Sequence, residues 1–186
     1  WIPPDPAGAI GPSDIICANN DDFRIYSRAG AQLFSVDIND FVGLFDRNYF
    51  DPKVIYDPWA GRFVIVYMYV DQNSTAANSL TGWLVLYSDD SSASGGWGWI
   101  HLNAGVNGST QNSEWDDYPY IGYDDDAYIL SARMFGWFGS SSDYGKIRFI
   151  AKADLFNGGG IAWWDMWSLT SDGTADRNVV PVQMNS

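Results

Sequence analysis

The strongest constraint on the fold is a stretch of sequence that occurs twice. Phe50–Asp57 aligns with Asp117–Asp124 so that Pro52 falls on Pro119. Each copy is followed by three further apolar segments, the last of which contains tryptophan and comes after a glycine-rich loop. The offset between the two copies stays between 63 and 67 residues throughout. Four strands that recur at a fixed period are typical of the blades of a β-propeller.

This repeat organises the rest of the chain into blades. It predicts two full blades at residues 50–102 and 117–169, a partial blade at 8–40 and the start of a further blade at 178–186. We therefore expect an all-β chain, a single propeller segment over residues 1–186 whose blades each have four antiparallel strands. The propeller would be incomplete, because such rings close with ~4–8 blades. A β-sandwich with chance similarity between the copies is the alternative.

An incomplete ring would leave apolar blade faces and strand edges exposed. We therefore expect either further blades, with this chain a fragment of something longer, or self-association. Only Ala151–Phe156, about one turn, has a helical pattern. The predicted strands are Asp14–Ala18, Phe23–Tyr26, Gln32–Val36, Lys53–Tyr56, Arg62–Val70, Trp83–Ser88, Gly98–Leu102, Tyr120–Gly122, Ala127–Arg133, Lys146–Ala151 and Trp163–Leu169.

Composition excludes several classes of protein. With 46% hydrophobic and 18% charged residues, the chain has the material for a packed core and is not a disordered acidic tail. A net charge of −13 argues against a nucleic-acid partner, because phosphate binding needs clustered Lys and Arg. The longest apolar run, Phe63–Val70, is too short for a membrane span of ~20 residues. No sequence feature indicates an organic cofactor.

The single cysteine and single histidine restrict the chemistry further. They exclude a disulfide within the chain and argue against a Cys/His zinc cluster or a serine nucleophile triad. We expect Cys17, between Ile16 and Ala18, to be a small buried apolar side chain.

Composition and the start of the sequence predict a protein that is secreted or displayed at the cell surface. Few lysines accompany many Asp, Trp and Gly residues, and the chain opens without a methionine, as after removal of a signal peptide or within a longer protein. Asn73 and Asn107 begin triplets of the N-glycosylation pattern, a pattern that also arises by chance.

Three segments resemble a known family. The segments that carry the resemblance are Pro3–Pro12, Asp51–Pro58 with Gly61–Phe63, and Asp117–Gly122. The resemblance is to secreted, mostly bacterial, BNR/sialidase-like propeller proteins, and it covers roughly residues 3–155. It implies a propeller fold outside the cell. It does not imply one activity, because this architecture serves glycosidases, lyases, lectins and adhesion modules alike. The arginine triad of sialidases is not recognisable here, so sialidase activity is not expected.

Acidic residues are the candidates for calcium binding. Two acidic clusters, Glu114–Asp117 and Asp124–Asp126, flank one short predicted strand, Tyr118–Tyr123, and would lie ~20 Å apart at its two ends. Either could contribute to a Ca²⁺ site, which takes six to eight oxygen ligands. Capping of turns is the alternative role for such Asp residues. The candidate metal ligands are Asp116, Asp117, Asp124, Asp125 and Asp126.

The same acids and the one imidazole are candidates for catalysis. Asp51 and Asp117 begin two blades, so they could face a common funnel as the carboxylate pair of a glycosidase. Glu114 is the only Glu and a candidate general acid. His101 lies on the Trp99 side of its strand and could act with a Tyr in a lyase. Turn caps and a half-buried strand histidine are the alternatives.

Aromatic residues indicate a carbohydrate ligand. Exposed Trp faces stack on sugar rings, and concave aromatic sites suit oligosaccharides. Seven Trp residues lie in or beside glycine-rich segments, and the segment 135–139 is a short aromatic loop. The seven are Trp97, Trp99, Trp115, Trp137, Trp163, Trp164 and Trp167. The candidate ligand-binding residues are Trp115, Trp137 and Phe138, with burial in the core as the alternative.

Together these features predict an extracellular recognition or scaffolding module that binds glycans or another component of the extracellular surface and is stabilised by calcium. One alternative is a polysaccharide-acting enzyme, a glycoside hydrolase or lyase, with part of its site outside this chain. The other is a structural subunit of an extracellular assembly.

Overall fold

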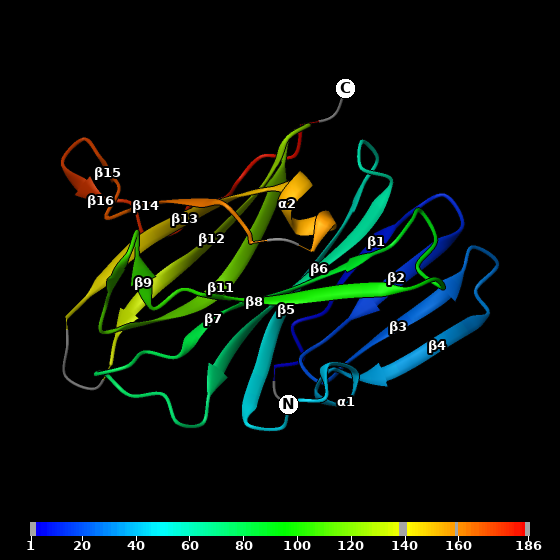
Figure 1. Ribbon diagram of the computed structural model, residues 1–186, viewed down its shortest axis with the longest axis horizontal. Helices are drawn as coiled ribbons and strands as arrows, with labels where there is room; N and C mark the ends of the chain where they lie inside the picture. The colour runs from blue at the N-terminus through cyan, green and yellow to red at the C-terminus, as the bar shows by residue number, and fades with distance from the viewer. Residues whose placement is uncertain (1–2, 138–140, 159, 185–186) are drawn as a thin grey trace. The chain divides into compact units, whose positions relative to one another are not determined.

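The computed structural model describes residues 3–137, 141–158 and 160–184, and it is all-β (Figure 1). Three antiparallel sheets have four strands each, in sequence order, and none of them closes on itself. The prediction of antiparallel four-stranded sheets is confirmed. No helix in the described part of the chain is long and apolar enough to cross a membrane.

We number the sheets in chain order. Sheet 1 consists of β1 (Ala7–Ile10), β2 (Asp14–Ala18), β3 (Asp22–Ser27) and β4 (Gln32–Asp37). Sheet 2 consists of β5 (Arg47–Asp57), β6 (Arg62–Asp71), β7 (Thr81–Ser88) and β8 (Trp97–Asn103). Sheet 3 consists of β11 (Glu114–Tyr123), β12 (Ala127–Gly136), β13 (Asp143–Ala151) and β14 (Trp163–Trp167).

The remaining elements are short. Two small hairpins pair β9 (Val106–Asn107) with β10 (Thr110–Gln111) and β15 (Thr170–Ser171) with β16 (Thr174–Ala175). Helix α1 covers Ile38–Val42 and helix α2 covers Lys152–Asn157. The one-turn helix expected at 151–156 matches α2 within one residue at each end, whereas α1 was not predicted.

One backbone feature recurs in the first strand of sheets 2 and 3 and directly before the first strand of sheet 1. A residue with positive φ directly precedes a proline at Asp5-Pro6 (φ 43°), Asp51-Pro52 (φ 52°) and Tyr118-Pro119 (φ 53°). Positive φ is uncommon for residues other than glycine, and a following proline restricts the backbone further. Strands β5 and β11 shift register at this point. The repeat found twice in the sequence therefore has three structural copies, one in each sheet.

The chain forms two compact units. The first contains residues 1–72 and 83–102, with sheets 1 and 2, and the second contains residues 73–82 and 103–186, with sheet 3. Each unit is described by itself below.

In the first unit, sheet 1 packs face to face on sheet 2. Ile16, Phe23 and Ile25 of sheet 1 join Ile65 and Leu86 of sheet 2 in one buried apolar cluster. Helix α1 adds its buried side chains to the same cluster. This short helix begins where the Asp37 carboxylate accepts the Asn39 N–H, and it ends at a left-handed glycine.

The two sheets meet through unlike faces. In each sheet we count residues from the repeated proline, which is Pro6, Pro52 or Pro119. The odd face is the face that carries the first and third residues after this proline, and the even face is the opposite one. Ala7 and Ala9, on the odd face of sheet 1, pack against the core, and so do Val54 and Tyr56, on the even face of sheet 2. Inside this unit, the odd face of sheet 1 therefore packs on the even face of sheet 2.

Strand β1 and Cys17 differ from expectation. The sequence predicted three strands over residues 8–40, whereas β1 supplies a fourth from small residues with little strand propensity. The prediction that Cys17 is buried is wrong: its thiol is exposed because Cys17 lies on the even face of sheet 1, opposite the core.

In the second unit, the even face of sheet 3 is buried. Its apolar part contains Ile121, Tyr128, Leu130 and Ile150, and Leu155 of α2 is also buried. The odd face of the same sheet is crossed by the C-terminal segment 176–184, where the start of a further blade was expected. The described part of this segment has no regular strand beyond single bridging contacts to sheet 3.

Candidate functional site

The first unit contains a hollow between sheets 1 and 2. It has a volume of about 590 Å³, within the range usual for small-molecule sites. Its wall comes from β3, β4, α1, the loop before β8 and the first residue of β8. The lining residues are Ile25, Leu33, Phe34, Phe41, Ala93, Ser94, Gly95 and Trp97.

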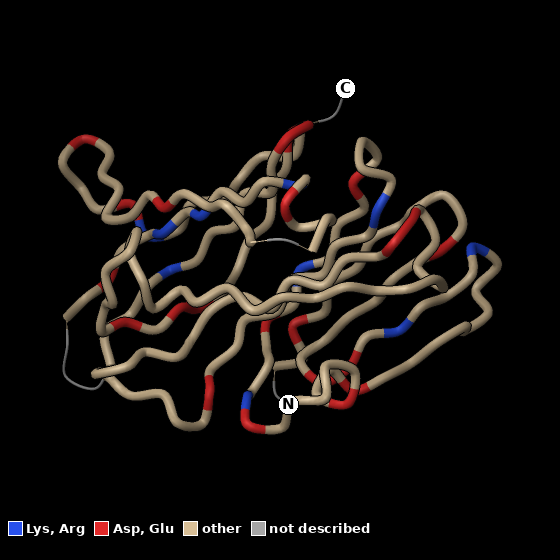
Figure 2. The backbone as a smooth tube through the Cα atoms, in the orientation of Figure 1, with Lys and Arg blue, Asp and Glu red and all other residues tan. Residues whose placement is uncertain are grey.

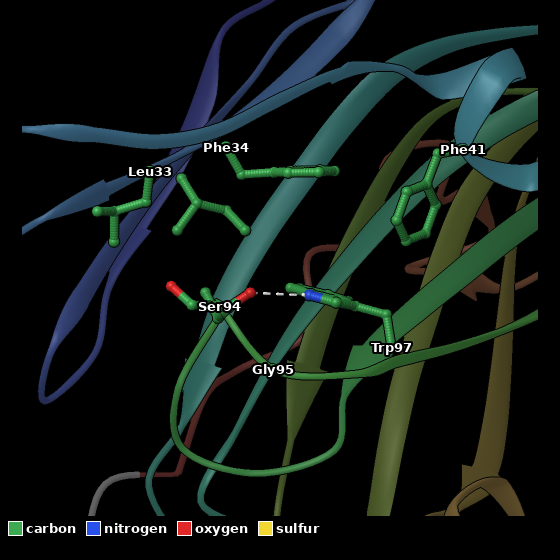
Figure 3. Close-up of a pocket in the computed structure, with 8 residues that line it drawn as sticks. Leu33, Phe34, Phe41, Ser94, Gly95 and Trp97 are labelled. Carbon is green, nitrogen blue, oxygen red and sulfur yellow. Dashed lines mark hydrogen bonds between the residues drawn. The ribbon is translucent and has the colours of Figure 1, made fainter.

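The hollow is aromatic on several sides. Figure 3 shows the rings of Phe34 and Trp97 on opposite sides of it, with Phe41 at one end. Phe23 is fully buried beneath them, and its ring centroid lies 5.9 Å from Phe34, 5.1 Å from Phe41 and 5.8 Å from Trp97. One buried ring therefore supports the three rings that a ligand would meet.

An irregularity in β4 supplies one side of the wall. Ile25 pairs with Phe34 but Tyr26 pairs with Gln32, so Leu33 is an extra residue in this strand. Such a bulge changes the direction in which neighbouring side chains point. As a result, the consecutive residues Leu33 and Phe34 both line the hollow.

Hydrogen bonds fix the opposite side of the wall. The indole Nε1 of Trp97 donates to the Ala93 carbonyl at 2.9 Å. The Ala93 N–H and the Ser92 hydroxyl donate to Asp14 Oδ2 at 2.7 and 2.9 Å. Asp14 is buried in β2, so a carboxylate of sheet 1 anchors the loop that carries Trp97. The wall is thus held in place without any ligand.

The lining favours binding over acid–base chemistry. Among the described residues that line the hollow, none has a titratable side chain, and Ser94 has the only polar side chain. Large apolar area with a few polar groups is the usual make-up of a site that binds a ligand by shape.

The predicted ligand-binding residues Trp115 and Trp137 lie together in the second unit. Their ring centroids are 6.3 Å apart, and Phe135 stacks on Trp115 at 5.4 Å. Arg133 lies over Phe135 at 4.6 Å and forms a bidentate pair with Asp143. Trp115 and Trp137 are both half-buried. Phe138 lies outside the described residues.

The predicted catalytic acids lie in different units. Asp51 is buried in the first unit at the positive-φ position of β5. Asp117 belongs to the second unit, where its Oδ1 accepts the Tyr118 N–H at 3.0 Å. Glu114, also in the second unit, accepts hydrogen bonds from the hydroxyls of Ser142 and Tyr144.

His101 lies in an aromatic enclosure on the Trp99 side of β8. Its ring packs edge to face against Tyr69 and Trp99, and its Nε2 is 2.9 Å from the Tyr49 hydroxyl. Burial, and then the charge of Arg47, lower the pKa of His101 to about 4, so the imidazole is neutral at pH 7. Burial raises the pKa of Tyr49 to about 12.

The candidate metal ligands are dispersed. Asp116 is buried on the even face of sheet 3, whereas Asp117 is on the opposite side of β11. Asp124 caps its turn by accepting the N–H groups of Asp126 and Ala127, and Asp125 and Asp126 are exposed. In residues 3–137, 141–158 and 160–184, no three His, Cys, Asp or Glu side chains form a group that could hold a metal ion.

The two asparagines of the glycosylation pattern have unlike surroundings. Asn73 is exposed. The half-buried Asn107 donates from its amide nitrogen to the Tyr144 hydroxyl at 2.9 Å and accepts from Lys146 Nζ at 3.1 Å.

A buried charged network in the second unit was not predicted. Asp165 accepts a bidentate pair of hydrogen bonds from Arg148 at 2.6 and 2.7 Å, and Lys146 Nζ lies 3.2 Å from the same carboxylate. Both cations also donate to backbone carbonyls of residues 103–106. The network thus anchors this loop to sheet 3. The sequence signal for this network was the presence of two charged residues, Lys146 and Arg148, at alternating positions of the otherwise apolar strand β13.

Buried charge shifts two pKa values in this region. Burial, and then the neighbouring Arg148, lower the pKa of Lys146 to about 8. Burial raises the pKa of Asp116 to about 7. Thr81 donates its hydroxyl to one oxygen of Asp116, and the other oxygen has no hydrogen-bond partner among the described residues.

No protein-family model matches this chain. A search of curated proteins finds no similar sequence.

Proposed function

We propose that this chain is an extracellular glycan-recognition module whose binding site is the hollow between sheets 1 and 2. The observation that carries the proposal is the placement of Phe34 and Trp97 on opposite sides of the hollow (Figure 3). Sugar rings have apolar C–H faces, so a ring between two aromatic side chains can bury both of its faces. The supporting contacts to Phe23 and Ala93 hold these side chains in place, which lowers the entropy lost on binding.

Charge favours a neutral glycan. The chain has a net charge of −13, and acidic residues greatly outnumber Lys and Arg along the backbone (Figure 2). Such a field repels carboxylated or sulfated sugars. The Ser94 hydroxyl and backbone groups of the lining loop suit the hydroxyls of a neutral sugar, which both donate and accept hydrogen bonds.

The scaffold part of the proposal is that the three sheets are propeller-type blades. Its support is the repeated positive-φ residue before Pro6, Pro52 and Pro119 and the packing of sheet 1 on sheet 2 through unlike faces. The resemblance to BNR/sialidase-like proteins points the same way, and so does the composition for a location outside the cell. Calcium stabilisation stays a prediction, to be checked by thermal unfolding with and without Ca²⁺.

The test is isothermal titration calorimetry with a panel of neutral oligosaccharides: hexasaccharides of β-1,4-glucan, β-1,3-glucan, xylan and mannan. A polygalacturonate fragment is the acidic comparison. We expect at least one neutral member to bind and the acidic one to bind more weakly. Phe34→Ala and Trp97→Ala should each weaken binding about tenfold, equivalent to ~1.4 kcal/mol.

The matched control is Trp164→Ala, which removes an exposed tryptophan of the second unit and should leave binding unchanged. Phe34 is partly exposed on an edge strand, so its variant should fold even if the Trp97 variant does not. The proposal is wrong if no neutral oligosaccharide binds, or if folded Phe34→Ala binds as tightly as the unchanged chain.

A further inference from the structure

We propose that this chain associates head to tail with a second copy, the odd face of sheet 3 in one copy packing on the even face of sheet 1 in the other. This inference goes beyond glycan recognition and does not depend on it. It rests on the structural equivalence of the three sheets, on their exposed faces and on the path of the C-terminal segment.

The first unit provides the template for the interface. There the odd face of sheet 1, with Ala7 and Ala9, packs on the even face of sheet 2, with Val54 and Tyr56. Since the same positive-φ residue before proline lies in or directly before the first strand of each sheet, equivalent faces can be identified in all three. Each of these sheets therefore has two different packing faces, and an odd face fits an even face.

In the described residues, the centres of four of the six faces are buried, although Phe34 on the odd face of sheet 1 and Trp167 on the even face of sheet 3 are partly exposed. Sheet 2 is buried on both sides, since Phe63 and Ile65 on its even face and Val64 and Val66 on its odd face have no exposed area. The centre of the even face of sheet 3 is buried as well, as Leu130 illustrates. The even face of sheet 1 and the odd face of sheet 3 are left.

These two exposed faces carry large apolar side chains. On the even face of sheet 1, Ile10 is 61% exposed and pairs with Ile15, and Cys17 is exposed beside them. On the odd face of sheet 3, Trp164 is 64% and Met166 48% exposed. Apolar patches of this kind on a soluble chain mark interaction surfaces. One is an even face and the other an odd face, which is the combination that packs inside the first unit.

The occupant we infer is a second copy because the partner of an odd face is the even face of the same repeat, and this chain itself exposes one. Unlike faces also make the contact heterologous, so each copy can use both of its faces at once. The expected assembly is thus a closed ring or a chain of copies.

The C-terminal segment lies where the partner's first strand would sit. In the first unit, β5 lies against β1 and β2 of the preceding sheet. On sheet 3, the Ser131 hydroxyl of β12 donates to the Val179 carbonyl, and Gln183 forms a parallel bridge with Tyr123 of β11. A side chain at Gly122 would meet Pro181 and the Val182 carbonyl, so the segment passes close over the sheet.

This segment is apolar on its outer side. Val180, Val182 and Met184 are 60%, 76% and 54% exposed. We infer that it competes with β1 of the second copy for the same place on sheet 3. Removal of residues 178–186 should then strengthen the association.

The experiment is sedimentation velocity of the full chain and of the chain without residues 178–186, from micromolar to millimolar concentration. We expect concentration-dependent association of the full chain, and a dissociation constant at least tenfold lower for the shortened chain. Ile10→Arg and Trp164→Arg should each abolish association, since a buried unpaired charge is costly. Phe45→Arg is the matched control, because Phe45 is 67% exposed but lies in the loop between α1 and β5, on neither face.

A mixture separates head-to-tail packing from a like-face contact. Ile10→Arg keeps an intact odd face on sheet 3, and Trp164→Arg keeps an intact even face on sheet 1. The two variants, each monomeric alone, should therefore form a heterodimer when mixed. The proposal is overturned if both the full and the shortened chain are monomeric over the whole range, or if the folded variants stay monomeric in the mixture.

Discussion

The side-chain oxygen of Asn20 accepts a hydrogen bond from the backbone N–H of Asp51 at 2.6 Å. The amide nitrogen of the same side chain donates to the Asp5 carboxylate and to the Pro3 carbonyl, each at 2.9 Å. Asn20 thus joins the two positive-φ residues, Asp5 and Asp51, that precede the repeated prolines of sheets 1 and 2. Because Asn20 is buried, its loss would leave the Asp51 N–H without this acceptor.

We expect Asn20→Ala to lower the free energy of unfolding by about 1–3 kcal/mol, the cost of unpaired buried polar groups. Urea unfolding followed by circular dichroism measures this. Asn48→Ala, at an exposed position of β5, is the control and should change stability by less than about 0.5 kcal/mol. Equal effects of the two variants would contradict a joining role for Asn20.

Asp14 positions the Trp97 side of the hollow without lining it. We expect Asp14→Ala to weaken oligosaccharide binding, because the loop over residues 92–97 loses two of its anchoring hydrogen bonds. Calorimetry with the best-binding oligosaccharide of the panel gives the change in affinity.

The control for Asp14 is Asp57→Ala. Asp57 is also buried in the first unit, but it accepts the N–H groups of Trp59 and Ala60 in a turn that does not line the hollow. It should lower stability and leave the affinity of the folded protein unchanged. A similar loss of affinity in both variants would argue that Asp14 acts only through stability.

The charged network of the second unit should be sensitive to loss of one partner. Asp165 has no exposed side-chain area and balances two buried cations. Asp165→Asn keeps the shape but leaves Lys146 and Arg148 without their carboxylate, so we expect a loss of about 3–5 kcal/mol. Asp143→Asn is the matched control, because its pair with Arg133 is about a quarter exposed and should contribute no more than about 1 kcal/mol. Denaturant unfolding of both variants measures how much unfolding free energy each one loses. The two losses should be equal if the network is not structural.

The strand pattern was predictable where the sequence alternates and where turn residues are distinctive. Pro52 and Pro119 aligned two copies of the repeat, and their strands appeared in the expected places. A partial blade was predicted at residues 8–40, but its first strand was missed because Ala7–Ile10 contains small residues and glycine, which carry little strand signal. Its proline, Pro6, sits in a proline-rich stretch where any one proline is hard to align.

The site was less predictable than the fold. Trp97 was recognisable as a tryptophan beside glycines, but nothing in the sequence brings it near Phe34, which is more than 60 positions away. That contact depends on how sheet 1 packs on sheet 2 and on the bulge at Leu33. Trp115 and Trp137 were easier, because paired strands bring the ends of β11 and β12 together.

Asp116 makes the stability of the second unit depend on pH. Its pKa is raised to about 7 by burial, against about 4 in an unfolded chain. The folded state therefore binds this proton more tightly than the unfolded state does. The resulting stability is fully present below pH 4, decreases as the pH rises through 7, and is absent above that.

Asp116→Asn removes this titration and keeps the shape of the side chain. We therefore expect the unchanged chain to lose stability relative to Asp116→Asn between pH 4 and 7, with a constant difference at higher pH. Urea unfolding of both proteins at pH steps from 4 to 8 measures the difference. Asp125→Asn, at an exposed turn position, should show no such relative slope. A difference between the unchanged chain and Asp116→Asn that is independent of pH over this range would refute the raised pKa.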